Sequence, residues 1–321
     1  MTVSIEKGQH WADMGESTSV VGIWLLYWVH RLLGRWPFRI CVYPVVLMYW
    51  LLNPRLRAVS LQYLRRVEAA TQAIGHEPGV IDSLRHVGLF AESMLDKLLA
   101  ASGRYHIAGV QTEGRERLYE DAAAGRGGLM VAAHMGCLEI GRAIAEHRGT
   151  VRLNILVHTR HAVRFNRLLT RLNPDSEVNL IEVTEIGPET AVLLSDKVAK
   201  GEYVIIAGDR VPVFASQTVD VDFLGHTAPF PAGPWVLASL LRCPVWFMCC
   251  IHSDDSYMIR FVRLCDRVVL PRGAREAAIA QFAARYADEV TALLRRSPYD
   301  WFNFFPFWDQ LHVERHRPDG L

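Results

Sequence analysis

The chain has 321 residues, a formal net charge of +1 and 50% hydrophobic residues, which is enough for one large or two modest domains with a well-filled core. The balanced charge gives no bulk electrostatic case for binding nucleic acid, and we expect no such partner. The high hydrophobic content and the mean hydropathy of +0.10 favour a protein that works at a membrane surface.

The six cysteines are scattered, without a CxxC pair or a zinc-type spacing. We interpret them as reduced, mostly buried thiols and expect no bound metal. The N-terminus is polar through Ser19, and no small-residue cleavage site follows the first apolar run, so we expect no signal peptide. The folded body is therefore predicted to face the cytoplasm.

The densest apolar region consists of two runs, Val20–Val29 and Ile40–Leu52, which flank a segment that contains Arg31, Arg35 and Arg39. Neither run reaches the roughly 18 to 20 apolar residues that a spanning helix needs. Amphipathic rings beside arginines are typical of a membrane interface. We predict two short helices that lie in a leaflet or dip into it; buried core helices and a single tilted span are the alternatives. The aromatic residues concerned are Trp24, Trp28, Trp36, Tyr43, Tyr49 and Trp50.

The second run ends at Asn53-Pro54, because proline disfavours helical structure in the residue before it. A basic stretch follows, which could meet anionic lipid headgroups or an acidic protein, or could form a solvated helix face. We divide the chain into an N-terminal membrane-associated helical segment, residues 1–60, and a main domain, residues 61–321. The basic residues are Arg55, Arg57, Arg65 and Arg66.

From Leu61 onward, strand-like apolar runs alternate with helical periodicity. This order predicts an α/β fold, with a central, mostly parallel sheet flanked by helices and joined by right-handed crossovers. Strands are expected at 106–110, 129–133, 152–157, 178–183, 203–207 and 219–224, with a final pair at 245–252 and 256–264. Helices are expected at 61–74, 80–101, 115–124, 138–147, 163–172, 188–199, 235–241 and 276–296.

Ligands of parallel sheets bind outside the carboxyl ends of the strands. His134, His158–Arg160 and Gly208–Arg210 each follow a predicted strand. These segments are therefore expected to lie together at one edge of the sheet, where a ligand would bind.

His134 and Glu139 are separated by Met135-Gly136-Cys137. On one continuous helix the two side chains would be about 140° apart, so they can cooperate only across a turn, for which Gly136 can adopt a positive φ. Glu139 would then lie in the first helical turn, where the dipole favours negative charge. A histidine can move a proton near neutral pH, and a nearby carboxylate can fix its tautomer. The spacing alone is a weak signal, and a structural histidine is the alternative.

Several other chemistries lack their motifs. The sequence has no GxSxG elbow and no P-loop, and Gly125–Gly128 precedes a strand, whereas a dinucleotide fingerprint follows one. A histidine base without a protein nucleophile suggests that the attacking group belongs to the substrate. The sequence therefore favours group transfer.

The HX4E motif His134-x4-Glu139 occurs together with four further segments, Val157–Arg160, Gly208–Val213, Val221–Gly225 and Pro229–Pro234. In combination these segments resemble the lipid A biosynthesis (lauroyl/myristoyl) acyltransferase family, within the wider lysophospholipid acyltransferase group. The resemblance covers most of the chain, and no single segment would suffice for it. It implies a glycerolipid acyltransferase-like fold, and transfer of a fatty acyl group from acyl carrier protein or coenzyme A to a lipid on the cytoplasmic face of the inner membrane.

The resemblance also implies residue roles. His134 would be the general base that deprotonates the acceptor, and Glu139 the carboxylate that orients it. Arg160 matches the family's later arginine and would bind a phosphate or stabilise the tetrahedral oxyanion, with Arg164 as a rival for that place.

The family's later aspartate matches Asp209. Its alternatives are pairing with Arg210 or capping the following turn. We predict Arg164, Arg210, Phe223 and Phe230 as substrate-binding residues, the two phenylalanines as part of an acyl groove; ordinary core packing is the alternative for the rings.

The family resemblance implies no cofactor beyond the acyl-ACP or acyl-CoA co-substrate, and it implies acyl carrier protein and a membrane lipid as partners of a peripheral or monotopic protein. Asn303–Trp308 is similar instead to acyltransferase-like proteins of aryl polyene and other specialised lipid pathways. We therefore expect the acceptor to be a hydroxyl or amine of a membrane lipid or glycolipid and do not restrict it to lipid A. A catalytically silent lipid-binding or scaffold protein and a thioesterase or esterase are the alternative functions.

Overall fold

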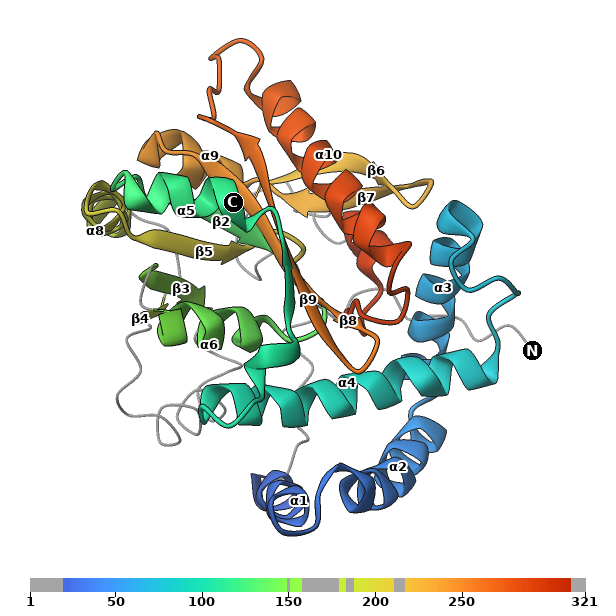
Figure 1. Cartoon of the computed structure of the whole chain (residues 1–321). Coiled ribbons are helices and arrows are strands. Elements are labelled where there is room, and N and C mark those ends of the chain that lie inside the picture. Colours follow the sequence, from blue (N-terminus) through green and yellow to red (C-terminus); the bar gives the residue numbers. More distant parts are fainter. Residues whose placement is uncertain (1–19, 149–150, 158–178, 183–187, 211–216, 313–321) are drawn as a thin grey trace, which may run out of the picture.

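The computed structural model describes residues 20–148, 151–157, 179–182, 188–210 and 217–312 (Figure 1). The predicted helix at 163–172 and the site residues Arg160 and Arg164 lie outside these residues.

A seven-stranded sheet, in the order β1-β9-β8-β2-β5-β3-β4, forms the centre of the protein. Its strand pairs are parallel except for the β8–β9 hairpin, whose strands are antiparallel. The predicted α/β fold with a mostly parallel sheet is thus confirmed. The strands are β1 Gln111–Glu113, β2 Gly128–Ala132, β3 Leu153–Val157, β4 Asn179–Glu182, β5 Tyr203–Ala207, β8 Val245–Ser253 and β9 Ser256–Cys265.

Helices lie on both faces of the sheet (Figure 1). Alternate residues of a strand point to opposite faces. Val131 of β2 therefore joins the core cluster that contains Tyr286 of α10, and its neighbour Met130 joins the cluster that contains Ile140 of α6. The helices of the body are α3 Pro54–Thr71, α4 Val80–Ala101, α5 Arg115–Ala123, α6 Leu138–Arg148, α8 Pro188–Ala199, α9 Gly233–Leu241 and α10 Arg275–Leu294.

One prediction about local structure was wrong. The strand expected at 106–110 is replaced by a 3-10 turn, Ile107–Gly109, in which the Val110 amide donates to the Ile107 carbonyl, and β1 begins only at Gln111. The structure also has a strand that the sequence did not predict, β7 His226–Pro231, which pairs with β6 Thr218–Phe223. Proline is tolerated in β7 because this strand has one partner within its two-stranded sheet.

The N-terminal region forms two helices, α1 Val20–Leu33 and α2 Arg35–Leu52, and α2 packs against α4. Phe38, Val42 and Val46 of α2 are buried. Within the described residues, no helix combines the length and hydropathy that crossing a bilayer requires. The outer side of the two helices exposes many large apolar side chains, including Leu25, Trp28, Leu32, Leu33, Trp36, Ile40, Leu47, Met48, Leu51 and Leu52.

Two arginines that we assigned to a membrane interface also connect α2 to α4. Arg39 pairs with Glu92 at 2.9 Å, and Arg35 pairs with Asp96 at 2.9 Å. The predicted boundary between the N-terminal segment and the main domain, at residue 60, lies inside α3. The N-terminal helices are therefore tied to the body through packing and charge.

Candidate active site

The register of the sheet brings His134 and Asp209 together. Ala132 of β2 pairs with Ala207 of β5, so residues two positions further along these parallel strands lie opposite each other. The Gly208 amide donates to the Ala132 carbonyl at 2.8 Å and extends this pairing beyond the strands. The two residues were predicted to lie at the same edge of the sheet, and this edge is where the structure places them.

Both carboxylate oxygens of Asp209 form hydrogen bonds with His134. The backbone amide of His134 donates to Oδ2 at 2.8 Å, and Nδ1 of its ring lies 2.7 Å from Oδ1. The Asp209 side chain is 1% exposed, whereas that of His134 is 33% exposed. The aspartate is therefore enclosed, and the histidine remains reachable from outside.

The charges around the pair determine its protonation. Burial disfavours an ionised Asp209, but His134 and Arg210 outweigh it and hold the pKa of that carboxyl well below its usual range. Burial and the nearby Arg210 lower the pKa of His134, against the opposing effect of Asp209. Near neutral pH the pair is thus a carboxylate and a neutral imidazole. A carboxylate only accepts hydrogen bonds, so Nδ1 carries the proton and Nε2 is free to accept one.

The C-terminal segment 300–303 closes over this pair. Trp301 Nε1 donates to Asp209 Oδ2 at 2.9 Å, and Asn303 Nδ2 donates to the same oxygen at 3.2 Å. The Phe302 amide donates to the His134 carbonyl at 2.9 Å. Asp209 therefore receives donors from two separate parts of the chain, which fix its orientation.

Arg210 is tied to the same segment. Its Nε donates to Asn303 Oδ1 at 3.2 Å, and its terminal nitrogen donates to the Phe302 carbonyl at 3.4 Å. Burial lowers its pKa, but the group stays charged near neutral pH. Arg210 thus lies beside the histidine as a cation held by C-terminal residues.

Glu139 lies where the sequence predicted, in the first turn of α6. The preceding turn requires Gly136, whose φ is +51° and whose Cβ, if present, would lie 2.2 Å from the Cys250 carbonyl oxygen. The Glu139 carboxylate pairs with Lys97 Nζ at 3.2 Å, and the Cys137 thiol lies 3.8 Å from it. We predicted that Glu139 orients His134; in the structure, Nδ1 of that ring has Asp209 as its partner.

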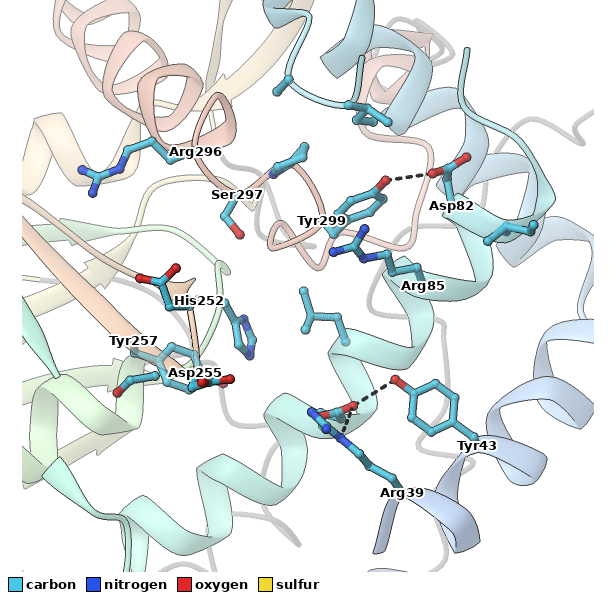
Figure 2. Close-up of a pocket in the computed structure, with 18 of the residues that line it drawn as sticks. Arg39, Tyr43, Asp82, Arg85, His252, Asp255, Tyr257, Arg296, Ser297 and Tyr299 are labelled. Carbon is cyan, nitrogen blue, oxygen red and sulfur yellow. Dashed lines mark hydrogen bonds and ion pairs between the residues drawn. The ribbon is translucent and has the colours of Figure 1, made fainter. Parts of the chain in front are cut away.

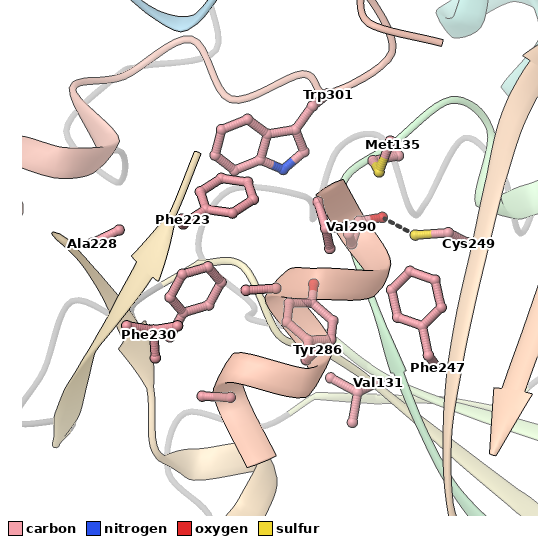
Figure 3. Close-up of a cluster of buried hydrophobic side chains, with 14 of the residues drawn as sticks. Val131, Met135, Phe223, Ala228, Phe230, Phe247, Cys249, Tyr286, Val290 and Trp301 are labelled. Atoms are coloured by element: carbon pink, nitrogen blue, oxygen red, sulfur yellow. Dashed lines mark hydrogen bonds between the residues drawn. The ribbon is translucent and has the colours of Figure 1, made fainter. Parts of the chain in front are cut away.

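Phe223 and Phe230 belong to the aromatic core in this structure. Each is 1% exposed, and their rings meet edge to face with centroids 5.5 Å apart (Figure 3). Phe223 also contacts the Trp301 ring at 5.3 Å, so these residues support the indole that holds Asp209. Their part in binding an acyl chain stays a prediction.

Three residues of the site were missed from the sequence, namely Lys97, Trp301 and Asn303. The only signal for the last two was the presence of polar donors inside an aromatic run, because a buried indole or amide needs a hydrogen-bond partner. Nothing in the helical pattern of α4 distinguishes Lys97 from an ordinary surface lysine.

Residues 82–310 match the model of a family described as bacterial lipid A biosynthesis acyltransferase. The comparison with curated proteins gave no match. The matched range begins inside α4 and includes the strands and the C-terminal segment that build the site, whereas α1, α2 and α3 lie before it.

Proposed function

Because the chain belongs to the bacterial lipid A biosynthesis acyltransferase family, we propose that it moves a fatty acyl group from a thioester of acyl carrier protein or coenzyme A to a hydroxyl or amine of a membrane lipid or glycolipid. Acyl transfer to a lipid is the activity of the family. The observation that carries the finer proposal is a reachable histidine with Nδ1 held at 2.7 Å by a buried carboxylate.

In this proposal, His134 Nε2 accepts the proton of the acceptor hydroxyl as the oxygen attacks the thioester carbonyl. The tetrahedral intermediate then expels the thiolate, which takes the proton from the imidazolium. A carbon–oxygen bond forms and a carbon–sulfur bond breaks, so no other reactant is needed. General base catalysis of this kind contributes roughly 10²–10⁴-fold in rate.

Asp209 orients the ring and stabilises the imidazolium that forms during the reaction. Glu139 acts on the same group through Lys97: it neutralises a cation that otherwise lowers the pKa of His134. Arg210 lowers the pKa of His134, whereas Asp209 raises it, so Arg210 helps to keep the imidazole unprotonated at neutral pH.

The remaining predicted roles complete the proposal. Arg160, with Arg164 as its rival, stabilises the oxyanion or binds a phosphate of the acceptor. Arg210 contacts substrate beside the histidine, and Phe223 and Phe230 shape the region behind it.

The test uses the purified full chain with acyl carrier protein thioesters, coenzyme A thioesters and a panel of lipid acceptors. His134→Ala is expected to lose roughly 10²–10⁴-fold in transfer rate. The matched control is His226→Ala, an exposed histidine on the β6–β7 hairpin, which is expected to retain the wild-type rate. Equal transfer by His134→Ala and wild type would overturn the mechanism, and free fatty acid as the main product would identify a hydrolase instead.

We further propose that the exposed apolar side of α1 and α2 rests on the cytoplasmic face of the inner membrane, as a peripheral or monotopic attachment. Trp36 is 74% exposed and Ile40 is 69% exposed, on the side of α2 opposite to its buried residues. Moving such rings and aliphatic chains from water into the interfacial region of a bilayer lowers the free energy. The protein could then bind its lipid acceptor without drawing it out of the bilayer.

Sedimentation with lipid vesicles tests this attachment. The double variant Trp36→Ser, Ile40→Asp is expected to shift from the vesicle pellet to the supernatant. The matched control is Val192→Ser, Leu193→Asp, which changes an exposed apolar pair on α8. Equal sedimentation of the α2 variant and the wild type would contradict the attachment.

A further inference from the structure

A second histidine repeats the contacts of His134. The backbone amide of His252 donates to Asp300 Oδ2 at 2.6 Å, and its Nδ1 lies 2.5 Å from Asp300 Oδ1. The Asp300 side chain is fully buried. The Tyr257 ring covers the imidazole with the centroids 4.2 Å apart. His252 is therefore held in one orientation by a carboxylate and a ring.

The other ring nitrogen of His252 has no such partner. Nε2 is buried, and no polar group among the described residues forms a hydrogen bond with it. A buried polar atom without a partner is costly, so it requires an explanation. His252 lines a cavity of ≈ 1160 Å³ between α2, α4 and the end of β8 (Figure 2). This volume is large enough for a small molecule or a lipid headgroup.

Arg85 faces this cavity from α4, opposite His252 (Figure 2). Its guanidinium lies over the Tyr299 ring, 4.5 Å from the centroid, and also forms a hydrogen bond with the Tyr299 hydroxyl, which itself donates to Asp82 at 2.8 Å. The ion pairs between described residues include none with Arg85, and Asp82 pairs with His76. A guanidinium has five N–H donors, so the contact with Tyr299 orients the planar fork and leaves donors for a ligand.

The other cations nearby are already neutralised. Arg35 and Arg39 pair with Asp96 and Glu92 at 2.9 Å each. Arg296 also lines the cavity and pairs with Glu113 at 2.8 Å. Among the arginines that line the cavity, Arg85 is thus the one whose charge no carboxylate pairs with at close range.

We propose that this cavity is a binding site for a phosphate ester, held by the guanidinium of Arg85 and by His252 Nε2. An arginine fork matches the spacing of two phosphate oxygens, and an imidazole whose Nδ1 proton is held by a carboxylate can accept the proton of a singly protonated phosphate at Nε2. Neither group belongs to the acyl-transfer machinery described above. The site is independent of the proposed acyl transfer and stands or falls on its own test.

Five acidic residues line the cavity and limit the affinity. Glu92 pairs with Arg39 and Asp82 with His76, whereas Glu77 is exposed. Asp254 and Asp255 lie on the exposed turn between β8 and β9. They repel an anion at long range, and their charge is screened by salt because they are exposed. Replacing both with asparagine is expected to strengthen phosphate binding, whereas variants of Arg85 and His252 should weaken it.

The phosphate can come from a soluble ester or from a lipid headgroup. Tyr43 of α2 lines the cavity, is 41% exposed, and belongs to the helix whose outer side presents apolar residues. Soluble probes and vesicles therefore have to be compared.

Calorimetry with inorganic phosphate and glycerol phosphate measures the soluble arm, and vesicles of phosphatidylcholine with and without phosphatidic acid measure the lipid arm. Arg85→Gln and His252→Gln are each expected to weaken binding of the preferred probe by roughly tenfold or more. Asp254→Asn with Asp255→Asn is expected to strengthen it. Arg285→Gln, an arginine over Phe282 at 5.8 Å on α10, is the matched control and is expected to bind as wild type.

Selective binding of a soluble probe would identify a free phosphate ester, and an Arg85-dependent preference for phosphatidic acid vesicles would identify a headgroup. His134→Ala should bind the probes as wild type does, whatever its transferase activity. Arg85 is exposed, so its replacement should leave the fold intact, which circular dichroism verifies. The proposal is overturned if no probe binds the wild type, or if Arg85→Gln and the asparagine variants bind like it.

Discussion

His134 and His252 make the same two contacts with an aspartate, yet their surroundings differ. Each donates its backbone amide to one carboxylate oxygen and holds the other oxygen with Nδ1. The His134 side chain is 33% exposed and lies near the Arg210 cation, whereas His252 is covered by Tyr257 and faces a cavity. The pairing fixes a tautomer in both cases, and the difference in surroundings is the reason that we propose proton transfer for His134 and ligand binding for His252.

Consecutive residues of the C-terminal segment connect the two pairs. Asp300 holds His252, and Trp301, its neighbour, donates to Asp209. The Gly136 amide donates to the Asp300 carbonyl at 3.0 Å, so the loop after His134 is fastened to the same segment. A change at one pair can therefore reach the other through this segment.

The largest expected effect comes from the aspartates. Asp209→Asn removes the acceptor of the Nδ1 proton and should lower the acyl-transfer rate by roughly 10²-fold or more. Because Asp209 raises the pKa of His134, its loss should also move the acid limb of the kcat/KM profile to lower pH. Asp300→Asn should reduce transfer far less and phosphate binding more.

Glu139→Gln belongs to the same experiment. It leaves Lys97 without its carboxylate near His134, so a smaller loss than that of Asp209→Asn is expected. A larger loss for Glu139→Gln would return to Glu139 the orienting role that the sequence motif predicted.

The next effect concerns stability and the segment that both pairs share. His86 is fully buried, donates from Nε2 to the Trp301 carbonyl and accepts at Nδ1 from the Ser60 hydroxyl, both at 3.0 Å. Burial lowers its pKa to about 4 from 6.5. The unfolded chain therefore binds a proton more readily than the folded protein, so stability is full above the unfolded value and falls as the pH drops from 6.5 toward 4.

For His86 this loss should reach about 2 kcal/mol between about pH 7 and about pH 5, measured as the free energy of unfolding in urea. His86→Gln can keep both hydrogen bonds without titrating and should show a smaller loss over that range. His226→Gln, on the exposed hairpin, is the control and should follow the wild type. An unchanged pH dependence in His86→Gln would contradict this assignment.

A more modest effect is expected at the cation beside the first pair. Arg210 lowers the pKa of His134, so Arg210→Gln should raise it and move the acid limb of the kcat/KM profile to higher pH. The sign is opposite to that of Asp209→Asn. Arg285→Gln, on α10, should leave the limb in place. A limb that moves to lower pH would show that Arg210 does not act through the charge of His134.

The smallest expected effect is the loss of one hydrogen bond. Trp301→Phe keeps an aromatic ring but removes the donor to Asp209, at a cost of roughly 1 kcal/mol, or about fivefold in transfer rate. Trp308→Phe is the matched control, because its indole donates to the Phe223 carbonyl at 3.2 Å and not to Asp209. Equal rates for the two variants would mean that the indole donor does not position the pair.

Local patterns predicted much of the fold. The periodicity that predicted helices at 80–101 and 188–199 matches α4 and α8, and the strand at 203–207 matches β5. The error at 106–110 has a physical reason: a short apolar run can close a 3-10 turn or extend, and only its distance from β9 decides where pairing begins. The turn at Gly136 was predicted because glycine readily adopts a positive φ, and the structure has φ +51° there.

The sequence by itself determined which residues end the strands, and so it placed His134 and Asp209 at one edge. It could not determine their contact, because the adjacency of β2 and β5 follows from how the whole sheet assembles. The donors at 301 and 303, the partner of Glu139 and the pairing of His252 with Asp300 likewise depend on residues far apart in the chain. Hydrophobic periodicity is a local property, whereas the partner of a buried polar atom is chosen by tertiary packing.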